Sequence, residues 1–390
     1  MMRTVAVCPA CGSPDRTIVM EYNGLVLLDY MRDSDLCRYD YGLCHTCGLV
    51  YASRRPEGEE LTFLYSRFDE FLGRSGRKAG DLSDEDEADL RRRLKAGWLL
   101  SEEGEPSGDD WLPEVLNKRM LSSYHINLVA ALTSLKGARV LELRSTTGFM
   151  LEICRKYLGA AEVYAMPMSA RHQLIIQELN EMPSALIDFD ELDVPFAGQF
   201  DLILSRHMLT HMLYPERLWA MFRERLRPGG RVYLFLENDD ASMFTRRKNL
   251  FGEMKCFHFQ NFDLTALARC MRYNQFEPEF IRHPFGGKSS ELVCMARYDP
   301  SVQGTPMSVN ELTARADMYE KWRTWSLAAS PDSVRGLYGS EMDTFIRRAI
   351  EGGYASLDKS GRFVPLVKLK TMHSDGYQAL NEEAALQQPH

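Results

Sequence analysis

The sequence has few of the features that a membrane protein or a nucleic-acid-binding protein needs. It contains no apolar run of the roughly 20 residues that span a membrane, and its start lacks the apolar segment of a signal peptide. Acidic residues outnumber basic ones by 55 to 47, so the formal net charge is -8 and a general basic face is not expected. We therefore expect a cytoplasmic protein with no membrane partner and no nucleic-acid partner.

Disulfides are not expected either, although the chain has nine cysteines. Four of them form two pairs, in CPACG and CHTCG, and each pair is spaced so that one tight turn aims both thiolates at one ion. Gly12 and Gly48 follow the second cysteine of each pair and ease the turn. Four thiolates complete a tetrahedral shell, which favours a structural zinc ion over four free thiols. The predicted ligands are Cys8, Cys11, Cys44 and Cys47, with Cys37 and His45 as spare candidates.

The pattern of the chain changes along its 390 residues, and we expect four regions. The second contains a helix that begins after Ser83 as its N-cap. The fourth contains helices over 308–330 and 340–353 and a hairpin that turns at 359–361. The regions are a zinc-ribbon-like module over 1–55, a helical connector over 56–135, an α/β domain over 136–300 and a helical C-terminal extension over 301–390.

The α/β domain alternates apolar strands with helical patterns, which predicts a mostly parallel, doubly wound, Rossmann-like sheet. Its last two strands are joined by only a few residues and must pair antiparallel, so we expect one reversed edge strand to close the sheet. Seven strands are predicted, over 139–143, 162–167, 184–189, 200–206, 231–238, 276–285 and 289–298.

The turn after the first of these strands lies in VLELRSTTGFML, residues 140–151. Many α/β folds hold a nucleotide-like cofactor at such a turn, and glycines let the backbone approach the ligand. Here Arg144, Ser145 and Thr146 occupy positions where small residues are usual, and Gly148 remains. The sequence leaves open whether this turn is a working cofactor loop or a relic of one.

Together these features resemble the class I S-adenosylmethionine-dependent methyltransferases that carry an N-terminal zinc module, a family of bacterial glycan and secondary-metabolite pathways. The likeness is carried by residues 44–66, which contain CHTCGLVY, by residues 190–238 and by residues 258–278, and it covers about residues 1–298. It implies S-adenosylmethionine as cofactor and methyl transfer to a small-molecule or sugar acceptor.

The resemblance also implies which residues contact the cofactor. Glu142 matches the acidic residue of the first motif, and Gly148 matches its last glycine. Asp190 fits the position that contacts the adenine amine. Met166 stands where a carboxylate should bind the ribose hydroxyls, and a thioether cannot accept both hydrogen bonds in its place.

Two histidines, one helical turn apart, match the HxxxH pattern of the family after its fourth strand. His207 is then a candidate for the cofactor pocket, and His211 is a candidate catalytic base. The alternative for both is a histidine that only packs against, or caps, the start of a helix, and we favour that alternative for His207.

Two functions follow from these observations. The first is methyl transfer to a small molecule or sugar. The second is a catalytically inactive relative that keeps the fold as a binding scaffold, with Arg144, Thr146 and Met166 in place of two glycines and an acidic residue. The match downstream of the third strand favours the first function, and the altered turn favours the second. The C-terminal extension is a candidate surface for a protein partner.

Overall fold

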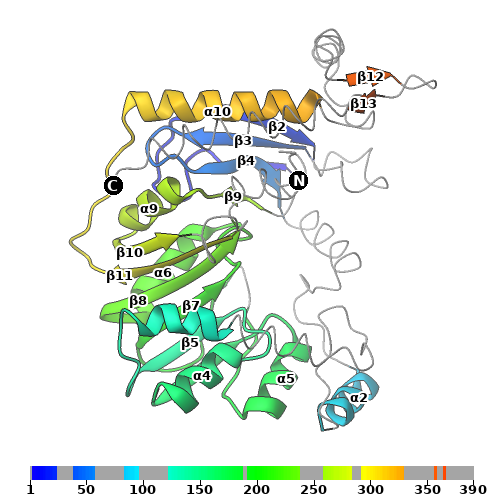
Figure 1. Cartoon of the computed structure of the whole chain (residues 1–390), viewed down its shortest axis with the longest axis vertical. Coiled ribbons are helices and arrows are strands. Elements are labelled where there is room, and N and C mark those ends of the chain that lie inside the picture. Colours follow the sequence, from blue (N-terminus) through cyan, green and yellow to red (C-terminus); the bar gives the residue numbers. More distant parts are fainter. Residues whose placement is uncertain are drawn as a thin grey trace.

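A computed structural model of the chain describes residues 2–23, 38–57, 83–95, 122–187, 191–237, 258–282, 291–328, 355–357 and 363–365. These residues form a large mixed sheet and a smaller antiparallel sheet, with a separate two-stranded hairpin near the C-terminus. Figure 1 shows the smaller sheet between a long helix and the large sheet. No described helix has the length and apolar character needed to cross a membrane.

The large sheet has six strands in the order β10-β11-β8-β7-β5-β6. Strands β5 to β8 pair in parallel, while β11 runs antiparallel to both of its neighbours. The predicted α/β class is confirmed, but the reversed strand lies between β8 and β10 rather than at the edge, because the chain enters the edge along β10 and then turns back. The strands are β5 (Arg139–Leu143), β6 (Glu162–Met166), β7 (Phe200–Arg206), β8 (Leu226–Glu237), β10 (Phe276–Arg282) and β11 (Glu291–Tyr298).

The strand expected over 184–189 is present only as a short edge segment beside β6. Ser184 makes an isolated parallel bridge to Ala165. Three backbone hydrogen bonds, of 2.9–3.1 Å, join this segment to the chain from Ala165 to Pro167. Pro183 has no N–H group with which the pairing could continue toward its amino end. Residues 188 and 189, the end of the predicted strand, lie outside the described part of the chain.

Helices cover both faces of the large sheet, because alternate strand residues point to opposite sides. Val140 packs with α4, α5 and the helix over 122–130, while its neighbour Leu141 packs with α6 and α9 on the other face. Trp219 of α6 is fully buried, and burying a side chain of this kind contributes about 1.5–3 kcal/mol. The helices are α4 (Phe149–Tyr157), α5 (Ala170–Asn180), α6 (Pro215–Arg225) and α9 (Leu264–Tyr273).

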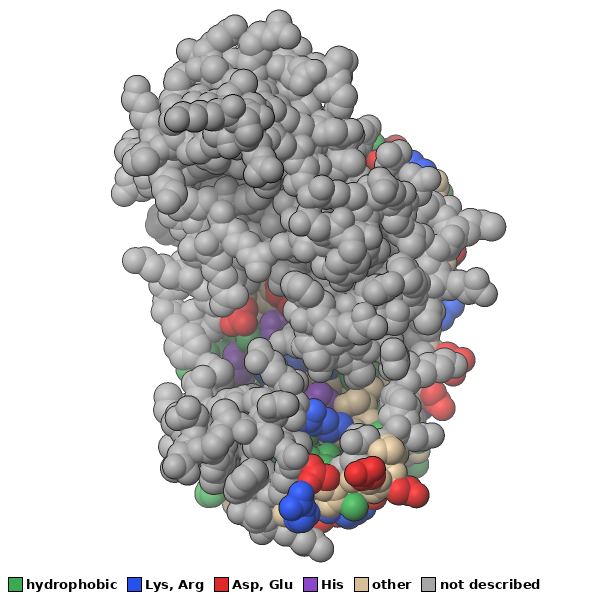
Figure 2. Space-filling view, turned by 90° about the vertical axis from the view of Figure 1, so that its right-hand side faces the viewer, with side chains coloured by type: hydrophobic (Ala, Val, Ile, Leu, Met, Phe, Trp, Pro, Cys, Tyr) green, Lys and Arg blue, Asp and Glu red, His purple; other side chains and the backbone are tan. Residues whose placement is uncertain are grey.

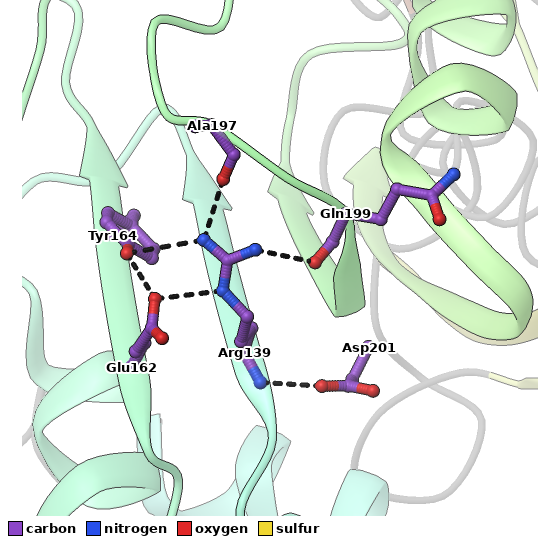
Figure 3. Close-up of polar contacts among 6 residues, drawn as sticks. All are labelled: Arg139, Glu162, Tyr164, Ala197, Gln199 and Asp201. Carbon is purple, nitrogen blue, oxygen red and sulfur yellow. Dashed lines mark hydrogen bonds and ion pairs between the residues drawn. The ribbon is translucent and has the colours of Figure 1, made fainter.

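A polar network fixes the amino ends of the parallel strands (Figure 3). The backbone N–H of Arg139 donates to Asp201 Oδ2 at 2.7 Å, and its guanidinium bonds Glu162 of β6 at 2.9 Å. The same guanidinium donates to the carbonyls of Ala197 and Gln199 before β7, at 2.7 and 3.0 Å. One side chain therefore ties together the starts of three strands, at the end opposite to their carboxyl ends.

The smaller sheet is antiparallel, in the order β1-β4-β3-β2, and β2 with β3 forms a hairpin between the two cysteine pairs. A short strand of the α/β region, β9 (Gln260–Asn261), pairs with β4. Cys44 and Tyr51 of this sheet, with Leu49 just before β4, belong to the same hydrophobic cluster as Leu141 of the large sheet. The two sheets therefore share one core. The strands are β1 (Met2–Thr4), β2 (Arg16–Asn23), β3 (Arg38–Cys44) and β4 (Val50–Pro56).

The C-terminal extension contributes α10 (Val309–Ala328), which lies along β2 and β3 in Figure 1. The helix starts with a capping box, in which Ser308 and Glu311 each accept the other's backbone N–H. Strands β12 (Ala355–Leu357) and β13 (Phe363–Pro365) pair antiparallel, which confirms the predicted hairpin. The helix expected over 340–353 lies outside the described residues. Within this extension, α10 covers the smaller sheet of its own chain. The partner surface expected in the extension stays a prediction.

Little of the connector is described. The predicted helix after Ser83 is α2 (Asp84–Lys95), and its Leu90 packs on Leu174 and Ile175 of α5. Within the connector, residues 58–82 and 96–121 lie outside the described residues.

Candidate functional site

The four cysteines of the two CxxC pairs come together at one point of the smaller sheet. Cys8 Sγ lies 3.6 Å from Cys47 Sγ, and Cys11 Sγ lies 3.5 Å from Cys44 Sγ. All four sulfurs lie within 4.8 Å of one another. Sulfurs at the corners of a tetrahedral zinc site, with zinc–sulfur bonds of about 2.3 Å, would lie about 3.8 Å apart. The donor set and its spacing therefore fit a closed tetrathiolate metal site.

Glycine shapes both turns of this four-cysteine cluster, as expected. Gly12 and Gly48 have φ angles of 76° and 78°, in the left-handed region. Their N–H groups donate to the carbonyls of Cys8 and Cys44, at 2.8 and 3.1 Å. A Cβ on Gly48 would also meet Met307 Sδ at 2.8 Å, so the Met307 side chain would have to shift for a larger residue to fit.

Of the two spare ligand candidates, the structure describes only His45, and it places another cysteine, Cys270, near the cluster. His45 bonds Thr17 at 2.8 Å and is not among the clustered ligand atoms, and Cys37 lies outside the described residues. Cys270 of α9, by contrast, places its sulfur 4.0 Å from Cys47 Sγ, although the two are 223 positions apart. No spacing rule could have linked them, because only the packing of α9 on the smaller sheet brings them together.

The turn over residues 144–148, after β5, is closed by its own side chains. Arg144 has a φ of 55°, the left-handed conformation that favours glycine, and its guanidinium donates to the carbonyl of His207 at 2.6 Å. This bond crosses from the carboxyl end of β5 to that of β7. Ser145 donates to Glu142 Oε2 at 2.8 Å, and its backbone N–H reaches the Met166 carbonyl at 3.3 Å.

The predicted cofactor residues lie in different environments. Burial raises the pKa of Glu142, whose carboxylate accepts the Ser145 bond. Gly148 has a φ of 72°, and a Cβ there would meet Asn180 Nδ2 at 3.3 Å. Met166 is fully buried in the core below the turn. Asp190 lies outside the described residues.

The two predicted histidines lie in the loop after β7, not on a helix. Pro215 fixes the start of α6 further along the chain, and His207 itself has a φ of 47°. Both histidines face the carboxylate that ends β8: Glu237 Oε1 lies 2.9 Å from His207 Nδ1 and 3.7 Å from His211 Nε2. Together with His258, whose Nε2 lies 3.8 Å from the same oxygen, they form a histidine–glutamate cluster.

Burial and the neighbouring charges set the protonation of this cluster. Burial lowers the pKa of His211 to about 3, so its imidazole is neutral near neutral pH. Burial alone would raise the pKa of Glu237, but the three histidines lower it well below its usual range, His207 most of all. The cluster therefore places a carboxylate beside the neutral imidazole of His211. Figure 2 shows histidine side chains on one face of the molecule, near acidic and basic side chains.

His258 is a site residue that the sequence did not reveal. It is buried, and its carbonyl accepts a bond of 2.9 Å from the hydroxyl of Tyr41, in the smaller sheet. The next residue, Phe259, donates its N–H to the Thr210 carbonyl at 2.8 Å. These bonds hold His258 beside the loop after β7. No motif marks it, because its position depends on the contact between the two sheets.

Residues 118–279 match the family model described as a methyltransferase domain. They contain the turn after β5, the histidine–glutamate cluster and the parallel strands. This region is similar to methyltransferase domains. The resemblance noted in the sequence is confirmed for this region. The carboxyl ends of β5, β7 and β8 are here called the carboxyl edge. They lie where such α/β folds bind ligands.

Relatives of the methyltransferase domain share only part of this chain. A ubiquinone biosynthesis O-methyltransferase of Nitrosococcus oceani is 31% identical over 104 residues, which are 26% of this chain and 44% of that protein, so the chain spans under half of its length. The structure of a magnesium protoporphyrin IX methyltransferase from Synechocystis, with bound S-adenosylhomocysteine, is 12% identical and has a TM-score of 0.40, covering 61% of this chain and 100% of its own. A methyltransferase structure from Mesorhizobium loti is 16% identical with a TM-score of 0.37, covering 44% and 95%.

Proposed function

We propose that this protein is an S-adenosylmethionine-dependent methyltransferase whose acceptor binds at the carboxyl edge. The single observation that carries the proposal is the histidine–glutamate cluster at the ends of β7 and β8. Placing a carboxylate among three imidazoles in a half-buried edge costs desolvation, and such groups concentrate at functional sites. The family match of the surrounding domain supports the same reading.

The residues of the turn partly fit the cofactor. Gly148 supplies a left-handed position of the turn, and Glu142 holds the turn through Ser145. We propose that the turn contacts the methionine part and that Asp190 contacts the adenine. Met166 offers no carboxylate for the ribose, and its side chain lies in the core. When bound, S-adenosylmethionine supplies an electrophilic methyl group on a sulfonium.

We propose that His207, rather than His211, accepts the proton of the acceptor. Its Nδ1 is the closer of the two histidine atoms to Glu237 Oε1, at 2.9 Å against 3.7 Å. A carboxylate on Nδ1 fixes the ring and leaves Nε2 to face an acceptor hydroxyl. The acceptor that we propose is a small hydroxyl compound such as a sugar. In an activity assay, His207→Ala should abolish turnover, and undiminished turnover of His211→Ala would remove His211 from consideration.

A second function, an inactive binding scaffold, is favoured by one observation. The Arg144 guanidinium spans the carboxyl edge to the His207 carbonyl and would stand near the sulfonium of the cofactor, where a like charge is unfavourable. Calorimetry of the folded chain with S-adenosylmethionine and S-adenosylhomocysteine separates the two. Micromolar binding of either compound supports the methyltransferase. No heat at millimolar ligand contradicts it and leaves the scaffold.

We also propose that the four-cysteine cluster binds one structural zinc ion. Four clustered thiols with no open position fit a structural rather than a catalytic metal. The seven described cysteines are unpaired thiols, which supports the reducing cytoplasm as the compartment. Metal analysis of protein purified without added metal should find about one zinc per chain. Substoichiometric zinc together with a folded smaller sheet would contradict the assignment.

A further inference from the structure

We propose that His211, Glu237 and His258 form a second metal site, for a divalent transition-metal ion. Each side chain offers one ligand atom, and these three atoms lie within 4.8 Å of one another. The site shares no residue with the four-cysteine cluster. It does not depend on the proposed methyl transfer, because the ion would bind whether or not a cofactor does.

The distances between the donor atoms are close to those between ligand atoms around a bound metal ion. Glu237 Oε1 lies 3.7 Å from His211 Nε2 and 3.8 Å from His258 Nε2. Nitrogen and oxygen ligands at about 2.1 Å from a tetrahedral ion lie about 3.4 Å apart. Contraction by a few tenths of an ångström, within the reach of side-chain torsions, would bring Glu237 Oε1 and each histidine nitrogen to this spacing, and the two nitrogens, within 4.8 Å of each other, would also have to close toward it.

The donor types decide the class of ion. Two imidazoles and one carboxylate suit zinc or iron(II), whereas magnesium and calcium prefer oxygen ligands alone. Three protein ligands leave at least one coordination position open, as in catalytic rather than structural sites. His258 is buried while the Glu237 side chain is 21% exposed, so the open position faces outward. An oxygen of an acceptor molecule could occupy it.

Surrounding bonds already orient the proposed ligands. Thr210 Oγ1 donates to Glu237 Oε2 at 2.9 Å, which leaves Oε1 for the ion. Tyr41 holds the backbone of His258, and His207 lies against Oε1 from the other side. Partners of this kind fix the rotamers of metal ligands and typically change metal affinity by about 10–100-fold when removed. The nearby cation of Arg144 opposes a metal ion, and the Glu237 carboxylate offsets it.

The test uses the full chain with zinc already in the four-cysteine cluster, titrated with cobalt(II) and followed by absorbance and calorimetry. We expect one further equivalent of cobalt to bind without the sulfur-to-metal charge-transfer bands that thiolate ligands produce. Those bands would reveal exchange into the cysteine site instead. A wild-type chain that takes up no cobalt, or takes it up only with these bands, would overturn the proposal.

Variants locate the cobalt within the chain. His211→Gln and Glu237→Gln should each weaken cobalt binding by more than about 100-fold, and Thr210→Val by about 10–100-fold. His172→Gln, on α5, is the matched histidine control and should bind cobalt like the wild type. Thermal unfolding without cobalt checks that each variant is folded. A folded His211→Gln that binds cobalt with wild-type affinity would contradict the site.

Discussion

The four-cysteine cluster and the histidine–glutamate cluster are both built from groups that can hold a metal, but they are assembled in different ways. Each half of the cysteine cluster is a single tight turn with a left-handed glycine. The histidine–glutamate cluster draws His211, Glu237 and His258 from the loop after β7, the end of β8 and the segment before β9. The first is nearly local, and the second exists only when the domain is packed.

The difference shows how function is distributed over this chain. A local, closed donor set suits a structural ion that holds a small sheet together. A donor set gathered at the carboxyl edge, with a partly exposed carboxylate, suits binding and chemistry, since that edge is where parallel α/β sheets take ligands. The variants below test the cysteine cluster and the surroundings of the carboxyl edge.

The largest effect is expected from the cysteine cluster. Cys47→Ser should lose the zinc and destabilise the chain by more than about 4 kcal/mol, because the cluster lies in the core that the two sheets share. Zinc content and thermal unfolding measure this. Cys154→Ala, a buried cysteine of α4 outside the cluster, is the control and should keep its zinc. Unchanged stability of Cys47→Ser would show that the cluster is not structural.

The next prediction concerns how the stability of the folded chain depends on pH. His125 is buried, its Nδ1 shares a 2.7 Å hydrogen bond with the Tyr233 hydroxyl, and burial lowers its pKa to about 3. The unfolded histidine, with a pKa of about 6.5, binds its proton first. Stability is therefore complete above about pH 6.5 and falls toward pH 3, by up to about 1.4 kcal/mol per pH unit.

Urea unfolding between about pH 7.5 and pH 5 measures this slope. His125→Gln keeps a hydrogen-bonding side chain but cannot be protonated, so its stability should depend less on pH than that of the wild type. Equal slopes for the two proteins would mean that His125 is protonated in the folded state.

A smaller effect tests how α10 supports the cysteine cluster. Arg315 pairs with Asp263 and donates to the Gly48 carbonyl at 2.9 Å, beside the second cysteine turn. Arg315→Ala leaves a largely buried carboxylate and should cost about 2–3 kcal/mol in thermal unfolding. Arg297→Ala removes a more exposed ion pair, with Asp299, and should cost less than about 1 kcal/mol. Equal losses would contradict a specific role for α10.

The smallest effect concerns the turn after β5. Arg144→Gly removes a cation near the proposed sulfonium and relieves the left-handed strain at this position. We expect S-adenosylmethionine to bind about tenfold more tightly, equivalent to about 1.4 kcal/mol, by calorimetry. Arg227→Ala, which removes an exposed cation paired with Asp201 at the other end of the strands, should leave the affinity unchanged. Weaker binding by Arg144→Gly would make this arginine a cofactor contact.

The sequence predicts the local features of the molecule well. The cysteine pairs with Gly12 and Gly48, the β2–β3 hairpin and the helix after Ser308 follow from short-range spacing and turn chemistry. The parallel sheet follows from alternating strands and helices. The strand predicted over 184–189 is longer than the observed one, because an apolar run in the sequence does not show how few backbone pairing partners an edge segment has.

The long-range features could not be predicted. His258 and Cys270 reach their sites only through the packing of the two sheets, which no spacing rule encodes. The sequence marks Arg144 as unusual, but only the folded chain shows that its guanidinium bonds the His207 carbonyl. The distances of His207 and His211 from Glu237 likewise depend on the folded loop after β7.

The most direct test of the proposed function is a crystal structure of the full chain with S-adenosylhomocysteine. We predict the ligand at the carboxyl ends of β5 and β6, with the Arg144 guanidinium moved away from the His207 carbonyl and the sulfur facing His207 and Glu237. A ligand bound elsewhere, or no ligand with the Arg144–His207 bond intact, would contradict it.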